Sequence, residues 1–204
     1  MATDAGIKDK NFATDTTICG NAACSVAGKL DDVGTSAVVG LAIGNRLPNN
    51  MRVELSYGYR GGFALDDKDV PLTAFKADIT SHAVLANVYW DFGASRRGMA
   101  PYLGFGLGWA RNTVGTISAT DTAGTISRAP GGTDSGLAWQ LSAGIGWPVS
   151  PTAVFDLGYR YFSAGNIETE VGNVTQGGAT VSTYQGAEGI LSAHEIIAAI
   201  RFGF

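Results

Sequence analysis

The sequence has little charge, few cysteines and no long apolar run. Charged residues make up 16% of the 204 residues, whereas a soluble domain usually carries about 25%. No stretch approaches the roughly 18 consecutive apolar residues of a membrane-spanning helix, which excludes a helical membrane protein. The net charge of −4 argues against a nucleic-acid-binding surface, because such a surface is basic.

The chain contains only two cysteines, Cys19 and Cys24. Their close spacing predicts a small loop closed by a disulfide in an oxidising compartment, with free thiols as the main alternative. A zinc site is disfavoured because there is no second cysteine pair, and His82 and His194 lie far away in the sequence. We therefore expect neither a metal nor a cofactor.

Glycine is abundant, at 29 residues, and it alternates with large apolar residues. In residues 51–60, apolar and aromatic side chains occupy every second position, with Arg, Glu, Ser and Gly between them. A period of two is that of a β-strand, and about 10 tilted residues can cross a bilayer. The alternation predicts seven strands, within residues 39–46, 51–60, 81–92, 102–112, 136–147, 153–162 and 195–204.

Two arrangements would satisfy this alternation. In a soluble barrel or sandwich the apolar face points inward, whereas in a membrane barrel it points outward to lipid. Trp and Tyr lie near the strand ends on the apolar face, where the aromatic girdles of membrane barrels occur. The opposite face combines glycine with a few charges, which suits a narrow lumen better than a solvent-exposed surface. The pattern therefore favours the membrane barrel.

The connections between the predicted strands alternate strictly between short and long. The short ones are residues 47–50, 93–100 and 147–151, and the long ones are 61–75, 114–135 and 164–189. Outer-membrane barrels have short periplasmic turns and long surface loops. The sequence therefore predicts an all-β, antiparallel, up-and-down transmembrane β-barrel over residues 34–204, with long loops exposed outside.

The predicted strand number is odd, whereas single-chain bacterial barrels have even numbers. The first predicted strand ends at a short turn, so we expect residues 1–33 to form the remnant of a surface loop. Residues 10–18 have no apolar face, and the start of the sequence has no apolar leader segment. We therefore expect an eight-stranded type of barrel that lacks its first strand and its signal peptide.

Charged residues on the glycine-rich face predict an ion-pair network that fills the lumen. Both signs are present, and each buried charge costs several kcal/mol unless it is paired. A narrow ion pathway is the alternative, although an eight-stranded barrel is just wide enough for side chains. The predicted lumen residues are Arg46, Arg52, Glu54, Arg60, Asp91, Gln140, Asp156, Arg160, Glu195 and Arg201.

The two histidines raise the possibility of a lipid-hydrolysing Ser/His/acid site on the outer wall. Ser81 precedes His82, and His194 precedes Glu195. Neighbouring residues on a strand point to opposite faces, so neither pair can readily meet. Strand parity places both imidazoles on the apolar face near the surface-side ends. They are therefore interpreted as interfacial polar residues.

Three stretches carry a resemblance to a known family: residues 39–47 followed by 51–60; residues 101–111; and residues 156–161 with 194–204. They resemble the OmpA-like and opacity-type eight-stranded barrels, which are porin-family outer membrane proteins of Gram-negative bacteria. The resemblance implies a location in the bacterial outer membrane, in contact with its lipid and lipopolysaccharide. It also implies an insertion signal at Phe204 that the barrel-assembly machinery reads.

The resemblance says little about function. Because loops on a rigid scaffold are a natural place for recognition, we expect a structural or surface-interaction role, without enzymatic activity, in which the long loops contact a ligand outside the cell. A narrow, low-conductance pore is the first alternative, and a barrel enzyme that modifies lipid A is the second. A soluble β-barrel is the third alternative.

Overall fold

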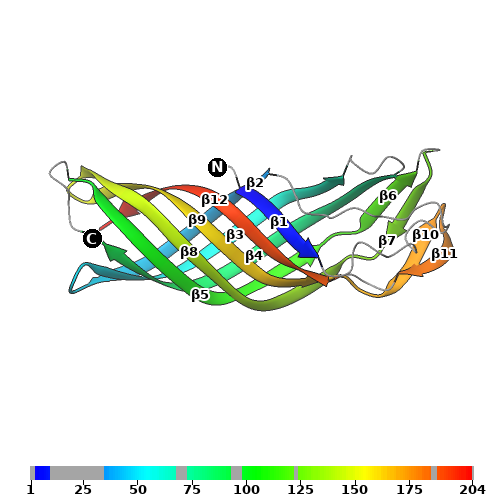
Figure 1. The fold of residues 1–204 in the computed structure, drawn as a ribbon, viewed down its shortest axis with the longest axis horizontal. Helices are drawn as coiled ribbons and strands as arrows, with labels where there is room; N and C mark the ends of the chain where they lie inside the picture. The colour runs from blue at the N-terminus through cyan, green and yellow to red at the C-terminus, as the bar shows by residue number, and fades with distance from the viewer. Residues whose placement is uncertain are drawn as a thin grey trace.

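The computed structural model describes residues 3–9, 35–67, 73–92, 98–121, 124–184 and 188–203. In these residues the chain forms a 12-stranded antiparallel sheet. Figure 1 shows a cylinder of tilted strands with a smaller sheet at one end. Among the described residues, no helix has the length and apolarity needed to cross a membrane.

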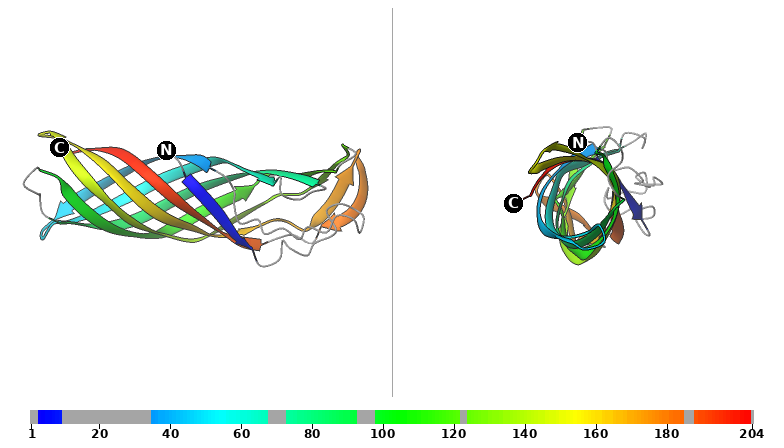
Figure 2. Two further views of the ribbon diagram at one scale, coloured as in Figure 1. Left: turned by 45° about the horizontal axis from the view of Figure 1, so that its top comes forward. Right: turned by 90° about the vertical axis from the view of Figure 1, so that its left-hand side faces the viewer.

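Eight of the described strands form a closed barrel. Neighbouring strands follow the order β4-β3-β2-β1-β12-β9-β8-β5, and β5 pairs again with β4. The end-on view of Figure 2 shows the ring. The barrel strands are β1 (Thr3–Asp9), β2 (Thr35–Leu47), β3 (Met51–Asp67), β4 (Thr73–Asp91), β5 (Ala100–Val114), β8 (Gly132–Ser150), β9 (Ala153–Glu168) and β12 (Glu188–Phe202). This confirms the predicted all-β antiparallel fold.

Four further strands continue the sheet beyond the barrel, and we call them the outer sheet. They are β6 (Ile117–Asp121), β7 (Ile126–Ala129), β10 (Gly172–Gln176) and β11 (Ala179–Tyr184). Strand β6 pairs with the first residues of β4, and β7, β10 and β11 follow in order. Figure 1 shows the outer sheet at the end opposite the C-terminus. The segments predicted as long loops therefore contain regular strands.

Strand β1 corrects the expectation that residues 1–33 form a surface loop after a missing first strand. Thr3–Asp9 pairs antiparallel with residues 189–195 of β12, and residues 3 and 4 also pair with residues 36 and 35 of β2. Strand β1 thus stands where the first strand of an eight-stranded ring belongs. Only Ile7 in this segment is large and apolar, so its hydrophobic pattern is too weak to indicate a strand.

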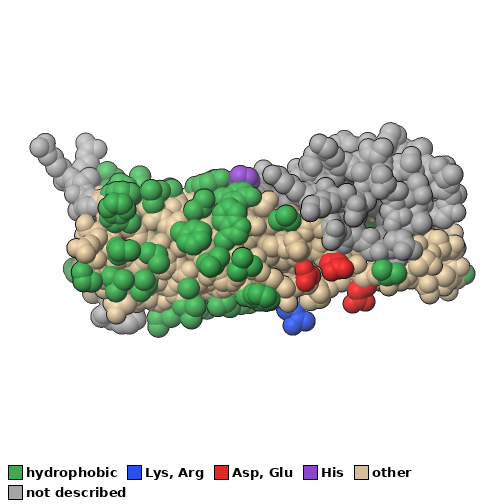
Figure 3. Space-filling model, turned by 60° about the horizontal axis from the view of Figure 1, so that its bottom comes forward, with side chains coloured by type: hydrophobic (Ala, Val, Ile, Leu, Met, Phe, Trp, Pro, Cys, Tyr) green, Lys and Arg blue, Asp and Glu red, His purple; other side chains and the backbone are tan. Residues whose placement is uncertain are grey.

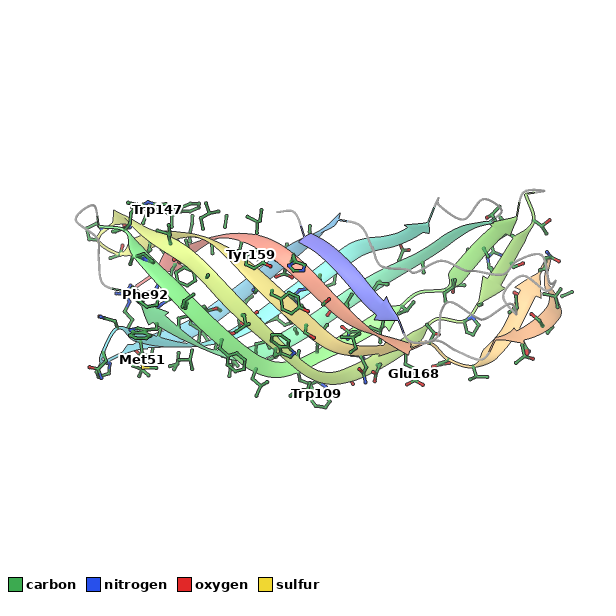
Figure 4. The ribbon with its side chains drawn as sticks, viewed as in Figure 1. Met51, Phe92, Trp109, Trp147, Tyr159 and Glu168 are labelled. Carbon is green, nitrogen blue, oxygen red and sulfur yellow. The ribbon has the colours of Figure 1, made fainter. Side chains whose placement is uncertain are left out.

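Apolar side chains cover the outside of the barrel. Leu41, Leu55 and Trp109 are 71%, 55% and 58% exposed, respectively. In Figure 4, Met51 and Trp147 lie toward one end of the barrel, Trp109 lies near its middle, and Glu168 lies farther toward the outer sheet. Figure 3 shows apolar side chains gathered over one part of the visible face and charged ones beyond them. A surface this apolar is suited to hydrocarbon rather than to water.

Candidate functional site

Charged side chains occupy the part of the lumen nearest the short turns. Arg52 Nη1 lies 2.6 Å from Glu54 Oε1, and Arg52 Nε lies 2.9 Å from Asp91 Oδ2. Arg201 donates two hydrogen bonds of 2.9 Å to the carboxylate of Asp156. Each of these five charges therefore has an oppositely charged partner, which offsets the cost of removing it from water.

Glu195 is the most deeply buried of these charges, at 0% exposed, and two arginines share it. Arg60 Nε lies 2.6 Å from Glu195 Oε1, and Arg160 donates to Oε2. The Arg60 guanidinium also lies 3.4 Å from the centre of the Phe162 ring. This trio carries one excess positive charge, whereas Arg52 with its two carboxylates carries one excess negative charge. The two clusters therefore balance each other.

Neutral polar and aromatic side chains fill the space between the charges. Gln140 donates a hydrogen bond of 2.7 Å to Asn87. The rings of Tyr89 and Tyr102 meet edge to face at 5.7 Å, and the Arg52 guanidinium lies 4.6 Å from the Tyr89 ring centre. Parity could have identified both tyrosines, because each lies on the face of its strand opposite the apolar one.

Glycines make room for the lumen tyrosines. A Cβ atom at Gly144 would lie 2.5 Å from the Tyr102 hydroxyl oxygen, and one at Gly158 would lie 2.6 Å from it. A methyl group at either position would therefore force the tyrosine or the neighbouring backbone to shift. The glycines on the lumen face therefore leave the space that bulky side chains from neighbouring strands occupy.

Buried apolar side chains fill the interior from the level of Arg60 toward the outer sheet. Ile79 and Phe162 are 0% exposed, and Leu191 is 1% exposed. We call the whole buried cluster the apolar plug; it consists of Ala77, Ile79, Ala83, Leu85, Ala110, Val114, Ile117, Ala119, Ala129, Ala138, Phe162, Ala164, Ile167, Val174, Leu191 and Ala193. Sequence reasoning missed it because several members, including Ile79 and Ile167, lie beyond the ends of the predicted strands.

The predicted lumen residues do not all join one network. Arg46 is exposed and has no ion-pair partner in the described part of the chain. Cys19, Cys24 and Phe204 lie outside the described residues, so the disulfide and the insertion signal stay predictions.

Both histidines lie on the outer wall, and each shares a hydrogen bond with a tyrosine. His82 Nδ1 lies 2.8 Å from the Tyr57 hydroxyl, and His194 Nδ1 lies 2.5 Å from the Tyr159 hydroxyl. Ser81 is buried on the opposite face of β4, so it does not meet His82. Within the described ranges, no three His, Cys, Asp or Glu side chains converge as metal ligands.

A closed antiparallel barrel with an apolar outer wall is the architecture of outer-membrane β-barrels. The chain belongs to the family described as "Outer membrane protein beta-barrel domain", whose family model matches residues 3–184. It is therefore a protein of the bacterial outer membrane.

Two bacterial proteins are among the solved structures that are similar to this chain. Neisserial surface protein A (NspA) is 20% identical with a TM-score of 0.46, over 100% of this chain and 93% of that chain. Ail, the attachment invasion locus protein of Yersinia pestis, is 13% identical with a TM-score of 0.38, over 96% of this chain and 93% of that chain. No curated protein sequence matches the chain.

Proposed function

We propose that this barrel is a non-enzymatic scaffold that presents the outer sheet to a partner outside the cell. The main support is the continuous pairing from β4 through β6, β7 and β10 to β11. A surface built on strands is held in place before a partner arrives, which lowers the entropy cost of binding.

The outer sheet also offers apolar side chains beyond the barrel wall. Ile126 on β7 is 45% exposed, Val181 on β11 is 43% exposed, and Val171 just before β10 is 65% exposed. Exposed apolar side chains on a water-facing surface favour contact with another macromolecule. These three residues are therefore the first candidates for partner contact.

The contents of the lumen support a scaffold rather than a narrow pore. An ion that passed Arg60 would have to cross the apolar plug, where Ile79 and Phe162 are fully buried. Moving a charge into such a region costs far more than thermal energy. The ion-pair network then serves to stabilise the barrel.

The outer-wall histidines support a non-enzymatic role over a lipid A-modifying one. Each imidazole shares its Nδ1 hydrogen bond with a tyrosine hydroxyl. A catalytic triad needs that nitrogen to donate to a carboxylate, so that the other nitrogen can act as a base. The mass profile of lipid A from cells with and without the protein tests this part of the proposal, and we expect the two profiles to be identical.

The experiment that tests the surface role is attachment of whole bacteria. Cells that carry the full chain are compared with empty cells on serum-coated surfaces and on epithelial cell layers. We expect the full chain to increase attachment, and we expect a variant with residues 172–184 replaced by a tight turn to lose the increase. In a matched control variant, Pro48 to Asn50 in a short turn are replaced instead. We expect this variant to keep the increase in attachment. Equal attachment of full-chain and empty cells to both surfaces would contradict the proposal.

A further inference from the structure

Two polar side chains are buried inside the apolar plug. Ser81 on β4 and Asn112 on β5 are 0% and 1% exposed, respectively. Their nearest neighbours on the same face of each strand are all buried and apolar: Ile79, Ala83, Ala110 and Val114. The apolar plug therefore encloses a small polar region.

Each of these two side chains has an oxygen atom without a hydrogen-bond partner in the described part of the chain. The atoms are Ser81 Oγ and Asn112 Oδ1. The two residues are directly opposite each other in the register of β4 and β5, so their Cβ atoms lie about 5 Å apart. Unpaired polar atoms in an apolar interior are costly. A small molecule that bonds to both oxygens would therefore stabilise the fold.

The amide group of Asn112 has a fixed orientation. Its Nδ2 atom donates hydrogen bonds of 2.9 Å and 3.0 Å to the carbonyl oxygens of Ala164 and Asn166. A flipped amide would place Oδ1 against these two carbonyl oxygens, which only accept hydrogen bonds. The unpaired atom of this amide is therefore an acceptor that needs a donor.

The two carbonyl groups that Asn112 binds belong to a β-bulge of β9. Residues 163 and 165 of β9 pair with the consecutive residues 192 and 191 of β12, so Ala164 is the extra residue. Gly165 has a φ angle of 78°, which glycine adopts without strain. Strand β8 lies between β5 and β9. Asn112 thus joins β5 to the bulge across the inside of the barrel.

The chemistry of the two oxygens favours a neutral ligand that both donates and accepts. An anion would meet the lone pairs of Asn112 Oδ1. A cation would lie close to Arg60, which is the residue opposite Ser81 in the register of β3 and β4. A water molecule can donate to Oδ1 and share a second hydrogen bond with the Ser81 hydroxyl, and buried waters typically have two to four such partners.

We propose that one water molecule binds between Ser81 Oγ and Asn112 Oδ1 and holds the Asn112 amide in the orientation that ties β5 to the β9 bulge. The bound water is a structural part of the apolar plug, because it satisfies both buried oxygens at once. Ser81 acts on the bulge through this water and is a positioning residue. The site does not depend on the proposed role of the outer sheet.

A crystal structure of the full chain, at a resolution that shows ordered water, tests the site directly. We expect one peak of electron density within hydrogen-bond distance of both Ser81 Oγ and Asn112 Oδ1. Ser81→Ala removes one of the two partners and should lose the peak. Hydrogen exchange in detergent micelles measures the effect on the bulge. We expect the backbone amides of residues 163–167 to exchange about fivefold faster in Ser81→Ala, as for the loss of one hydrogen bond.

The control variant is Ser56→Ala. Ser56 also faces the lumen, but its hydroxyl accepts a hydrogen bond of 2.8 Å from Asn87. This variant should keep both the density peak and the slow exchange of residues 163–167. Heat-modifiable migration on a detergent gel shows that each variant is folded.

Three results would overturn the proposal. The first is a wild-type structure without density at the site, or with a direct hydrogen bond between Ser81 and Asn112. The second is an anomalous signal at the site from crystals soaked in bromide or rubidium, which would identify an ion. The third is equal exchange of residues 163–167 in Ser81→Ala and wild type.

Discussion

The two halves of the lumen are filled by different physical means. Toward the short turns, arginines and carboxylates form ion pairs such as that of Arg201 with Asp156. Toward the outer sheet, the apolar plug consists of buried apolar side chains. The halves meet where the Arg60 guanidinium lies over the Phe162 ring. The comparison indicates that the first half depends on particular partners, whereas the second depends on shape and volume.

The largest effect is expected from Glu195→Gln, which removes the one carboxylate between two arginines. Because this leaves two guanidinium groups without a counter-charge, we expect the free energy of unfolding to fall by about 3–5 kcal/mol. Urea unfolding in lipid vesicles, followed by heat-modifiable migration, measures the change. Glu168→Gln, at an exposed position, is the control and should change stability by less than about 0.5 kcal/mol. If both variants lower the unfolding free energy equally, the ion pairs of Glu195 have no special role in stability.

A similar but more variable loss is expected in the apolar plug. Ile79→Ala leaves a cavity among fully buried neighbours and should lower the unfolding free energy by about 2–5 kcal/mol. Val181→Ala on the exposed outer sheet should stay within about 0.5 kcal/mol of wild type. The same urea titration compares them. Ile79→Leu nearly conserves the side-chain volume. If it lowers the unfolding free energy as much as Ile79→Ala does, the stability of the apolar plug does not depend on volume.

Glycine substitutions provide a test of how tightly the charged half is packed. Gly144→Ala would push a methyl group against the Tyr102 hydroxyl, and such overpacking typically costs about 1–3 kcal/mol. Gly136→Ala has open space around the added methyl group, so stability should be unchanged or higher by about 0.4–1 kcal/mol. Thermal unfolding in micelles distinguishes the two variants. If Gly136→Ala proves less stable than wild type, the stability at this glycine depends on something other than room for a methyl group.

The smallest effect is expected at Arg46, which faces Arg52 across the turn between β2 and β3. Arg46→Gln removes an exposed charge without a described partner, so stability should change by less than about 0.5 kcal/mol. Arg52→Gln leaves Glu54 and Asp91 unpaired and should cost clearly more. Parallel urea titrations of the two variants measure this contrast, and equal losses would place Arg46 in the network after all.

Strand parity predicted the wall of the barrel well, because each wall residue faces either lipid or lumen and the sequence alternates accordingly. The charges of the lumen were predicted as a set, but their pairing was not. Arg60 and Glu195 lie on strands that are far apart in sequence, and the shear of the barrel decides which side chains meet.

The outer sheet and strand β1 could not be predicted in the same way. Residues 117–121 and 179–184 are short and rich in Ser, Thr and Ala, so their alternation of polar and apolar residues is too weak to indicate a strand. Their strands form because neighbouring strands supply hydrogen-bond partners, which is a tertiary effect. The apolar plug was missed for a related reason, since it is built partly from the strand ends that reach into this region.

Conductance of the refolded full chain in a planar lipid bilayer tests most directly whether the apolar plug closes the lumen. We expect no steady current through the wild-type protein, and a small steady current through Phe162→Gly, because that variant loses the ring that covers Arg60. A steady single-channel current through the wild type would contradict it.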